Sequence, residues 1–128
     1  MKPWIKTTLL LMAASFLIAA KPNLGGFKPE QVCQAAIASV QGVKPHLVRQ
    51  YRRDGDTMQL RLSQGGNTHS FYCELQADNV LWRRSADSVW QQSPSVGFSY
   101  NSSGKKLVIK HSLGSAQLAE FSFRGEDF

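Results

Sequence analysis

The chain has 128 residues and a formal net charge of +6, with 15 lysines and arginines against 9 acidic residues. This length is typical of one domain, and the basic residues are spread out instead of forming the dense runs of a nucleic-acid-binding protein. We therefore expect one domain and no nucleic-acid partner. An acidic protein or an anionic envelope component fits the charge better.

The first twenty residues have the pattern of a secretory signal peptide. Lys2 and Lys6 precede an uncharged, mostly apolar stretch at residues 7–20, as in the n-region and h-region of such peptides. A membrane-spanning helix needs about 20 apolar residues, so we expect cleavage after Ala20 or Ala19 and no transmembrane span afterwards. The alternative is an uncleaved N-terminal anchor. The predicted location is the periplasm or the outside of the cell.

Residues 21–128 are predicted to form a single α+β domain. Without Lys2 and Lys6 the net charge is +4, from 13 basic and 9 acidic residues. Residues 21–26 are rich in turn formers and are expected to be a flexible leader, and residues 124–128 are expected to be a loose tail. A domain of 108 residues buries only about two-thirds of its unfolded surface, so a single cross-link matters to its stability.

The stretch from Phe27 to Gly42 predicts an amphipathic helix. Pro29 suits the first helical turn and Gly42 is a natural terminator. Apolar residues recur at i, i+3, i+4 and i+7, and they form one stripe that consists of Cys33, Ala36, Ile37 and Val40. The glutamines between them are expected to face water, namely Gln31, Gln34 and Gln41. The small residues of the stripe predict a close approach of the helix to a sheet.

Beyond Pro45 the period of the apolar residues changes from 3.6 to 2, which predicts short β-strands separated by polar turns. The predicted strands span residues 46–51, 58–63, 69–75, 80–84, 89–91, 96–100, 105–113 and 116–123, and the strand at 89–91 is weak and interrupted before Pro94. Such short connections favour an antiparallel meander. The predicted fold is therefore α+β, with one N-terminal amphipathic helix packed on a curved antiparallel β-meander of about six or seven short strands.

The two cysteines, Cys33 and Cys73, are expected to pair. Alternation places Cys73 on the apolar face of its strand with Phe71 and Leu75, and the helical stripe places Cys33 toward the same interface. Two cysteines in an exported chain usually form a disulfide, which contributes about 3–4 kcal/mol for a loop of this length. The alternative is a pair of redox-active thiols, but such pairs favour a C-x-x-C spacing that this sequence lacks.

Four segments together resemble an uncharacterised group of small exported bacterial proteins, and these segments are CQAAIASVQG, FYCELQADNVLWRR, VWQQ and GFSYNSSGKKLVIK. Proteins of this group have one cysteine near the start of a helix, a second in the strand before an N-V-L-W-like segment, and a set of short strands. The resemblance extends from Gly26 to about Phe123. It implies the fold, with one helix-to-strand disulfide, and an exported location, and it brings no activity or site residues.

Catalytic and metal-binding patterns are weak, and we expect no enzyme activity, no cofactor and no metal. His46, His69 and His111 lie in or beside three different strands, so surface histidines are a simpler explanation than the alternative of a metal site assembled in space. The segment Ser102–Lys105 matches S-x-x-K, but that chemistry requires the serine at the start of a helix in a larger enzyme. Turn formation explains the acidic residues that flank Gly55.

The predicted outer face of the sheet carries the candidate binding residues. Alternation places Arg61, Tyr72 and Arg83 on neighbouring strands and pointing away from the helix, with Glu74 close by. Arginine and tyrosine are enriched at binding hot spots. Further arginines at strand ends are expected to extend the patch, namely Arg52, Arg53 and Arg84. The alternative is a solvated face on which Glu74 and the arginines form cross-strand ion pairs.

The large aromatic residues Trp82, Trp90 and Phe98 are expected to fill the core. The predicted function is that of a monomeric, non-enzymatic binding protein of the bacterial envelope, which recognises another envelope or secreted protein as an inhibitor or immunity-type protein would. One alternative is a structural or accessory component of an envelope or secretion assembly that docks through exposed strand edges. Another is a carrier of a small anionic or apolar ligand held between the helix and the sheet.

Overall fold

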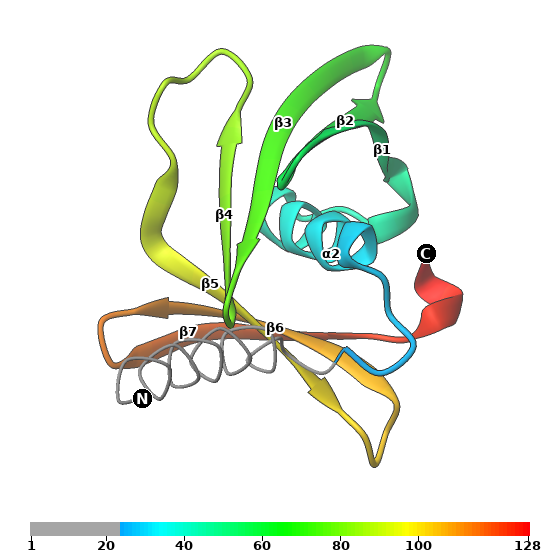
Figure 1. Cartoon of the computed structure of the whole chain (residues 1–128), viewed down its shortest axis with the longest axis vertical. Helices are drawn as coiled ribbons and strands as arrows, with labels where there is room; N and C mark the ends of the chain where they lie inside the picture. The colour runs from blue at the N-terminus through cyan, green and yellow to red at the C-terminus, as the bar shows by residue number, and fades with distance from the viewer. Residues whose placement is uncertain (1–23) are drawn as a thin grey trace, which may run out of the picture.

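The computed structural model describes residues 24–128. The predicted signal peptide, residues 1–20, and the first residues of the predicted leader, 21–23, lie outside the described residues. Residues 24–128 form one α-helix, α2, packed on a seven-stranded antiparallel sheet. Figure 1 shows this sheet curving around the helix. The predicted α+β fold, with one helix on a curved meander, is therefore confirmed.

Helix α2 spans Pro29–Gln41, and local interactions define both of its ends. Pro29 occupies the first turn, where backbone N–H groups have no partner within the helix, so the N–H that proline lacks costs no hydrogen bond. The N–H of Lys28, the N-cap residue, donates to Gln31 Oε1 at 2.9 Å. Gly42 ends the helix with a φ of +70°, a left-handed conformation that glycine adopts without steric cost. The residues that begin and end the helix are thus those that the sequence pattern indicates.

The seven strands follow one another across the sheet in the order of the sequence, and neighbouring strands are antiparallel. They are β1 Val48–Asp54, β2 Thr57–Gln64, β3 Asn67–Gln76, β4 Asn79–Arg84, β5 Gln91–Asn101, β6 Lys106–Leu113 and β7 Ala116–Phe123. Short turns join most of them, as a meander requires. Because the sheet is open, β1 and β7 form its two edges.

The hydrophobic core lies between α2 and the inner face of the sheet. On β2, Met58, Leu60 and Leu62 are buried, and Leu60 lies opposite buried Phe71 of β3. Successive residues of a strand point to opposite faces, so the residues between these three point outward. The alternation that predicted the strands therefore also separates the core side of the sheet from its outer side.

Helix α2 is buried over more of its circumference than the predicted stripe. Ala35 and Ala38 lie outside that stripe, yet both are fully buried. The helix contacts β1–β4 and also β6, because the curved sheet passes above and below it in Figure 1. Gln34, which was expected to face water, instead donates from Nε2 to the carbonyl oxygen of Val48 at 2.6 Å.

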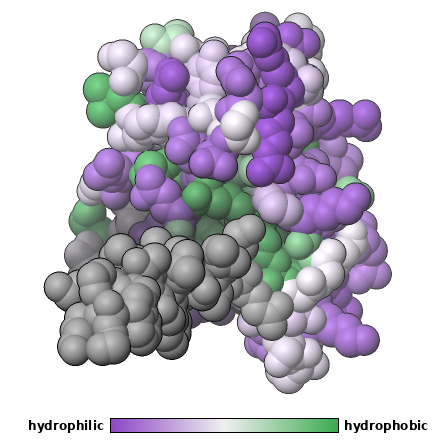
Figure 2. All heavy atoms as spheres, in the orientation of Figure 1, coloured by the Kyte–Doolittle hydropathy of each residue, from purple (hydrophilic) through white to green (hydrophobic). Residues whose placement is uncertain are grey.

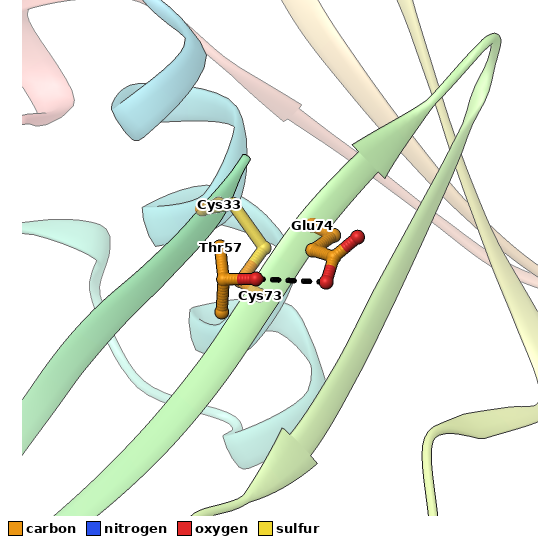
Figure 3. The surroundings of a disulfide bond; sticks show 4 residues. All are labelled: Cys33, Thr57, Cys73 and Glu74. Carbon is orange, nitrogen blue, oxygen red and sulfur yellow. Dashed lines mark hydrogen bonds between the residues drawn. A yellow bond between two sulfur atoms is a disulfide. The ribbon is translucent and has the colours of Figure 1, made fainter. Parts of the chain in front are cut away.

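A disulfide joins Cys33 of α2 to Cys73 of β3, as predicted. The two Cα atoms are 6.1 Å apart and both residues are fully buried. Figure 3 shows the bridge on one side of β3 and the side chain of Glu74 on the other. The bridge links residues 40 positions apart, and closing a loop of that length contributes about 4 kcal/mol in the chain-entropy model.

The prediction of two short strands on either side of Pro94 is wrong, because one long strand, β5, runs through this residue. Against β4, Val80 pairs with Val96 and Trp82 pairs with Gln91, and the residues of β5 between these pairs have no partner in β4. Proline has no N–H to donate to a neighbouring strand. The strands β4 and β5 therefore separate beside Pro94.

The end of the chain is packed, in contrast to the loose tail expected at residues 124–128. A short 3-10 helix, η2 (Gly125–Asp127), follows β7 and is followed by Phe128, which packs against the core. The centroid of the Phe128 ring lies 5.9 Å from that of Phe27 and 6.2 Å from that of Phe123. Burial of this last apolar side chain stabilises the segment.

The described part of the expected flexible leader is packed as well. Leu24 contacts the core, and its carbonyl oxygen accepts a hydrogen bond from the N–H of Phe27 at 3.0 Å. Gly25 has a φ of +59°, and a Cβ at this position would overlap the ring of Tyr100. Only glycine suits both the left-handed backbone and the close approach. The residues just before α2 thus form a tight turn against the domain.

Candidate functional site

The outer face of β1–β4 carries most of the predicted binding residues. Arg61 of β2 lies opposite Arg49 of β1, and Tyr72 of β3 lies opposite Arg83 of β4. Directly opposed residues share one face of a sheet. Because Leu60, next to Arg61, is buried on the inner side, these four side chains point away from α2. Figure 2 shows mostly hydrophilic residues over the upper part of the molecule, where Figure 1 places these strands.

Arg61 stacks on an aromatic ring near the edge of the sheet. Its Cζ atom lies 3.8 Å from the centroid of the Tyr51 ring, which is a cation–π contact. Both side chains line a groove of about 320 Å³, here named the basic groove, which consists of His46, Leu47, Arg49, Tyr51, Arg61 and Ser63. The 3-10 helix η1 (Pro45–Leu47) supplies the first two of these residues, and β1 and β2 supply the others.

The two arginines of the basic groove face each other across β1 and β2. Like charges directly opposite on neighbouring strands destabilise a sheet. Residues 24–128 contain one ion pair, in which Lys110 Nζ of β6 lies 3.9 Å from Glu120 Oε1 of β7. No carboxylate of this part of the chain therefore neutralises Arg49 or Arg61.

Glu74, which was expected close to the arginines, is engaged elsewhere on the outer face. Its Oε2 accepts a hydrogen bond from Thr57 Oγ1 at 2.8 Å (Figure 3). It lies opposite Leu81 of β4, not opposite an arginine. In the part of the chain that the structure describes, the cross-strand ion pairs of the alternative interpretation are not formed.

A second arginine of the outer face is held between two aromatic rings. The Cζ atom of Arg83 lies 4.3 Å from the ring centroid of Tyr72 and 5.1 Å from that of Trp90. Arg83 Nη1 also donates a hydrogen bond to the carbonyl oxygen of Asp87. These contacts hold the guanidinium in one orientation. We name Tyr72, Arg83 and Trp90 the Arg83 stack.

One of the three large aromatic residues expected in the core lies at the surface. Phe98 is buried, and Trp82 packs against the core from the inner face. Trp90 is only half-buried and contacts Arg83 instead. It belongs to the connection between β4 and β5, where strand alternation does not determine the direction of a side chain. For Trp90 the prediction of a core position is wrong.

The three strand-end arginines are divided between the two faces. A register shift in β1 just before Arg52 leaves this residue facing outward, while Arg53 lies opposite inward-facing Met58. Arg84 lies opposite Phe71, which is buried against the core. Arg53 and Arg84 are thus exposed residues at inner-face positions, and only Arg52 extends the outer patch.

A contact that the sequence pattern did not reveal joins α2 to β6. Ser39 Oγ lies 2.8 Å from the carbonyl oxygen of Ala36 and 2.8 Å from His111 Nε2. The hydroxyl donates to Ala36, so its oxygen accepts the Nε2–H of His111. Burial lowers the pKa of His111. The sequence could have indicated the inward position of His111, because alternation places this residue on the same face of the strand as Leu107 and Ile109.

The pair of Ser39 and His111 is not arranged as an activated nucleophile. A general base must accept the proton of the nucleophile, whereas the Ser39 proton is directed to its own helix and His111 is the donor. The other two histidines, His46 and His69, lie in η1 and β3. Within residues 24–128, no group of three potential metal-ligating side chains is found.

Comparison of the chain with protein-family models, with curated proteins and with solved structures found no match. No helix within residues 24–128 has the length and apolar character needed to cross a membrane. Function must therefore be inferred from the surfaces of the molecule, and the basic groove and the Arg83 stack are the most distinctive of them.

Proposed function

We propose that this protein is an exported, non-enzymatic binding protein of the bacterial envelope, and that it recognises an acidic protein partner through the basic groove. The buried disulfide supports the location, because disulfides persist in oxidising compartments. The lysines and the apolar stretch at the N-terminus support it as well. Inhibition of the partner, or immunity against it, stays a prediction.

The observation that carries this proposal is the unneutralised pair of arginines in the basic groove. Arg49 and Arg61 are exposed and directly opposed, and neither is in ion-pair contact with a carboxylate of the described chain. A carboxylate placed between them would exchange a repulsion for charge-assisted hydrogen bonds, which are roughly twice as strong as neutral ones. An acidic side chain of a partner protein meets this requirement.

Two other residues supply the apolar part of such an interface. Tyr51 is 43% exposed and Leu47 is 37% exposed, and both border the arginines in the basic groove. Interfaces are typically dominated by a few aromatic and arginine side chains. Because Arg61 already lies on the ring of Tyr51, less side-chain entropy is lost when a partner binds.

The Arg83 stack extends the same face toward β4. Its arginine is held by two rings and by the carbonyl oxygen of Asp87, so the free edge of the guanidinium is presented in a defined direction. Such preorganisation is a general source of binding affinity. The stack and the basic groove together cover all four strands from β1 to β4, which suits a protein partner better than a small ligand.

The edges of the sheet are less suited to binding than its outer face. The register of β1 shifts between Gln50 and Arg52, and that of β7 shifts opposite the bond between His111 and Ser112. Bulges and charged side chains at edges discourage the addition of a further strand. These features favour recognition by side chains over the alternative of an assembly component that docks through its strand edges.

Capture of partners from an envelope extract tests this proposal. The immobilised protein is compared with an Arg49→Glu/Arg61→Glu variant, and the affinity of each purified partner is then measured by calorimetry. We expect an acidic partner whose affinity falls by about 100-fold in the variant, since two charge-assisted hydrogen bonds of about 1.5 kcal/mol or more are lost.

A matched control separates the groove from the net charge. An Arg53→Glu/Arg84→Glu variant changes the charge by the same amount at exposed inner-face positions, and we expect it to retain the partner. Equal loss of affinity in both variants would assign binding to the overall charge and not to the groove. An unchanged affinity in the groove variant would overturn the proposal.

A further inference from the structure

A cavity of about 270 Å³ opens at the C-terminal end of α2, on the inner side of the sheet. It lies beside the place where β4 and β5 separate, and β6 contributes one of its walls. The residues that line it are Ser39, Val40, Trp82, Gln91, Ser93, Pro94, Val96 and His111. The middle of the interface between α2 and the sheet is filled by buried side chains, so the cavity is confined to this end.

One wall of the cavity is polar and has a defined order of hydrogen bonds. Ser39 donates to the carbonyl oxygen of Ala36 and accepts from His111 Nε2. The imidazole therefore carries its hydrogen on Nε2, and Nδ1 is an acceptor that no other described residue engages. Gln91 adds an amide that both donates and accepts. These groups complement hydroxyl or amide groups of a ligand.

The cavity carries no formal charge. None of the described residues that line it is acidic, lysine or arginine. Burial lowers the pKa of His111, so the imidazole is neutral at neutral pH. A charged ligand would lose its hydration here without gaining a counter-ion, which is unfavourable.

The remaining walls are mostly apolar, and Ser93 adds one further hydroxyl group. Trp82 occupies an inward position opposite Cys73 of β3, and Val40 of α2 and Pro94 and Val96 of β5 line the cavity as well. The face of an indole ring is electron-rich, and it attracts C–H groups that carry a small positive charge. A ligand with one apolar face and a polar rim would satisfy both kinds of wall.

We propose that this cavity binds one neutral sugar ring, a pyranose that bears hydroxyl or acetamido groups. The C–H face of such a ring suits Trp82, and its hydroxyl groups suit His111 and Gln91. The volume of about 270 Å³ lies just below the roughly 300–1,000 Å³ of typical ligand sites, which limits the ligand to about one ring. A purely apolar ring would leave the polar groups of the wall unpaired, which is costly.

This site is separate from the proposed protein-binding surface. Trp82 and Arg83 are consecutive residues of β4 and point to opposite faces of the sheet. Arg83 belongs to the outer face, and Trp82 belongs to the cavity. The protein therefore presents a charged surface for a partner on one side and an uncharged cavity for a small ligand on the other.

Titration of the isotope-labelled, disulfide-bonded protein with N-acetylglucosamine, followed by amide NMR, tests the proposal. We expect saturable shifts centred on Ser39, Gln91, His111 and the indole of Trp82, with a dissociation constant in the millimolar range. Removing one hydrogen-bonding group that faces the ligand should weaken binding by about fivefold, and the variants for this purpose are Gln91→Ala and His111→Phe. Trp82 is left unchanged because it packs against the core.

One protein variant and two other small molecules serve as controls for this titration. Arg61→Glu, on the outer face, should bind the sugar as the unchanged protein does. Glucuronate and indole serve as the charged and the apolar probes, and both should bind more weakly than N-acetylglucosamine. The proposal would be overturned by the absence of saturable shifts in the millimolar range or by tighter binding of either control probe. It would also be overturned if the Gln91→Ala and His111→Phe variants both bound the sugar with the affinity of the unchanged protein.

Discussion

Arg49 and Arg61 lie directly opposite each other, and neither forms an ion pair with a carboxylate of the described chain. A sheet selected for stability alone would carry opposite charges at such positions, because favourable cross-strand pairs contribute roughly 0.2–1 kcal/mol. Residues that serve binding often lower stability in this way. The stability of charge variants therefore measures the repulsion independently of any partner.

We expect an Arg49→Glu substitution to raise the free energy of unfolding by about 0.5 kcal/mol at low ionic strength. An attraction to Arg61 replaces a repulsion, while the stack of Arg61 on Tyr51 is kept. Urea unfolding measures the change, which should shrink at high salt because of screening. Arg53→Glu is the control and should give no such gain. A loss of stability in Arg49→Glu would contradict the observed register.

His111 is the residue whose protonation should matter most to the fold. It faces Ser39 of α2, Val96 of β5 and Phe121 of β7, none of which titrates. Burial lowers its pKa from the ordinary value of 6.5. The unfolded chain then binds a proton more readily than the folded one, so stability falls as the pH drops below that value. The loss ends once the folded protein is itself protonated at His111.

A His111→Gln variant should show a smaller decrease in the free energy of unfolding between about pH 7.5 and about pH 5, because the buried titrating group is gone. Denaturant unfolding at a series of pH values measures this slope. The same slope in His111→Gln as in the wild type would mean that other groups cause the acid sensitivity.

At the scale of elements, the helix and the sheet bury each other more completely than either pattern implies. The periodicity of α2 predicts one apolar stripe, but Ala35 and Ala38 are fully buried as well, and the helix contacts η1 and β6 in addition to β1–β4. Alanine at these positions allows the backbone of the helix to come close to its neighbours. The small side chains of α2 are therefore a packing requirement on more than one side of the helix.

We expect Ala35→Leu to lower the free energy of unfolding by about 1–3 kcal/mol, because the larger side chain overfills a packed interior. The single-stripe interpretation predicts almost no change at this position. Gln92→Leu, at an exposed position of β5, is a matched control and should change stability by less than about 0.5 kcal/mol. Chemical unfolding distinguishes the two results.

At the scale of the whole molecule, the disulfide joins the helix to the centre of the sheet. Cys73 lies opposite Met58 of β2 and Trp82 of β4, so the bridge anchors Cys33 among the inner strands of the meander. A domain of this size has a small margin of stability. The cross-link therefore accounts for a large part of the net free energy of unfolding.

Replacement of both cysteines, Cys33→Ala/Cys73→Ala, should lower the free energy of unfolding by about 3–4 kcal/mol, since the unfolded chain regains the entropy of an open loop. Guanidinium unfolding of the oxidised protein and of the variant measures the difference. Reduction of the wild-type disulfide should cause a loss of similar size. A change below about 1 kcal/mol would show that packing alone holds α2 in place.

Much of the candidate site was predictable from alternation, and the failures have identifiable causes. Arg61, Tyr72 and Arg83 lie on the outer face because successive residues of a strand point to opposite sides. Arg53 does not, because the bulge in β1 reverses the alternation after Gln50. Nothing in the local pattern of the sequence marks that bulge.

The sequence by itself determined the helix and most of the strands of this protein, their order in the sheet and the pairing of Cys33 with Cys73. These features follow from the period of the apolar residues and from the residues that form caps and turns, which act over a few positions. Only the tertiary structure decided the register of β1, the separation of β4 from β5, the contact of Ser39 with His111 and the docking of Phe128. Each depends on the curvature of the sheet and on contacts between residues distant in the chain, which no local period records.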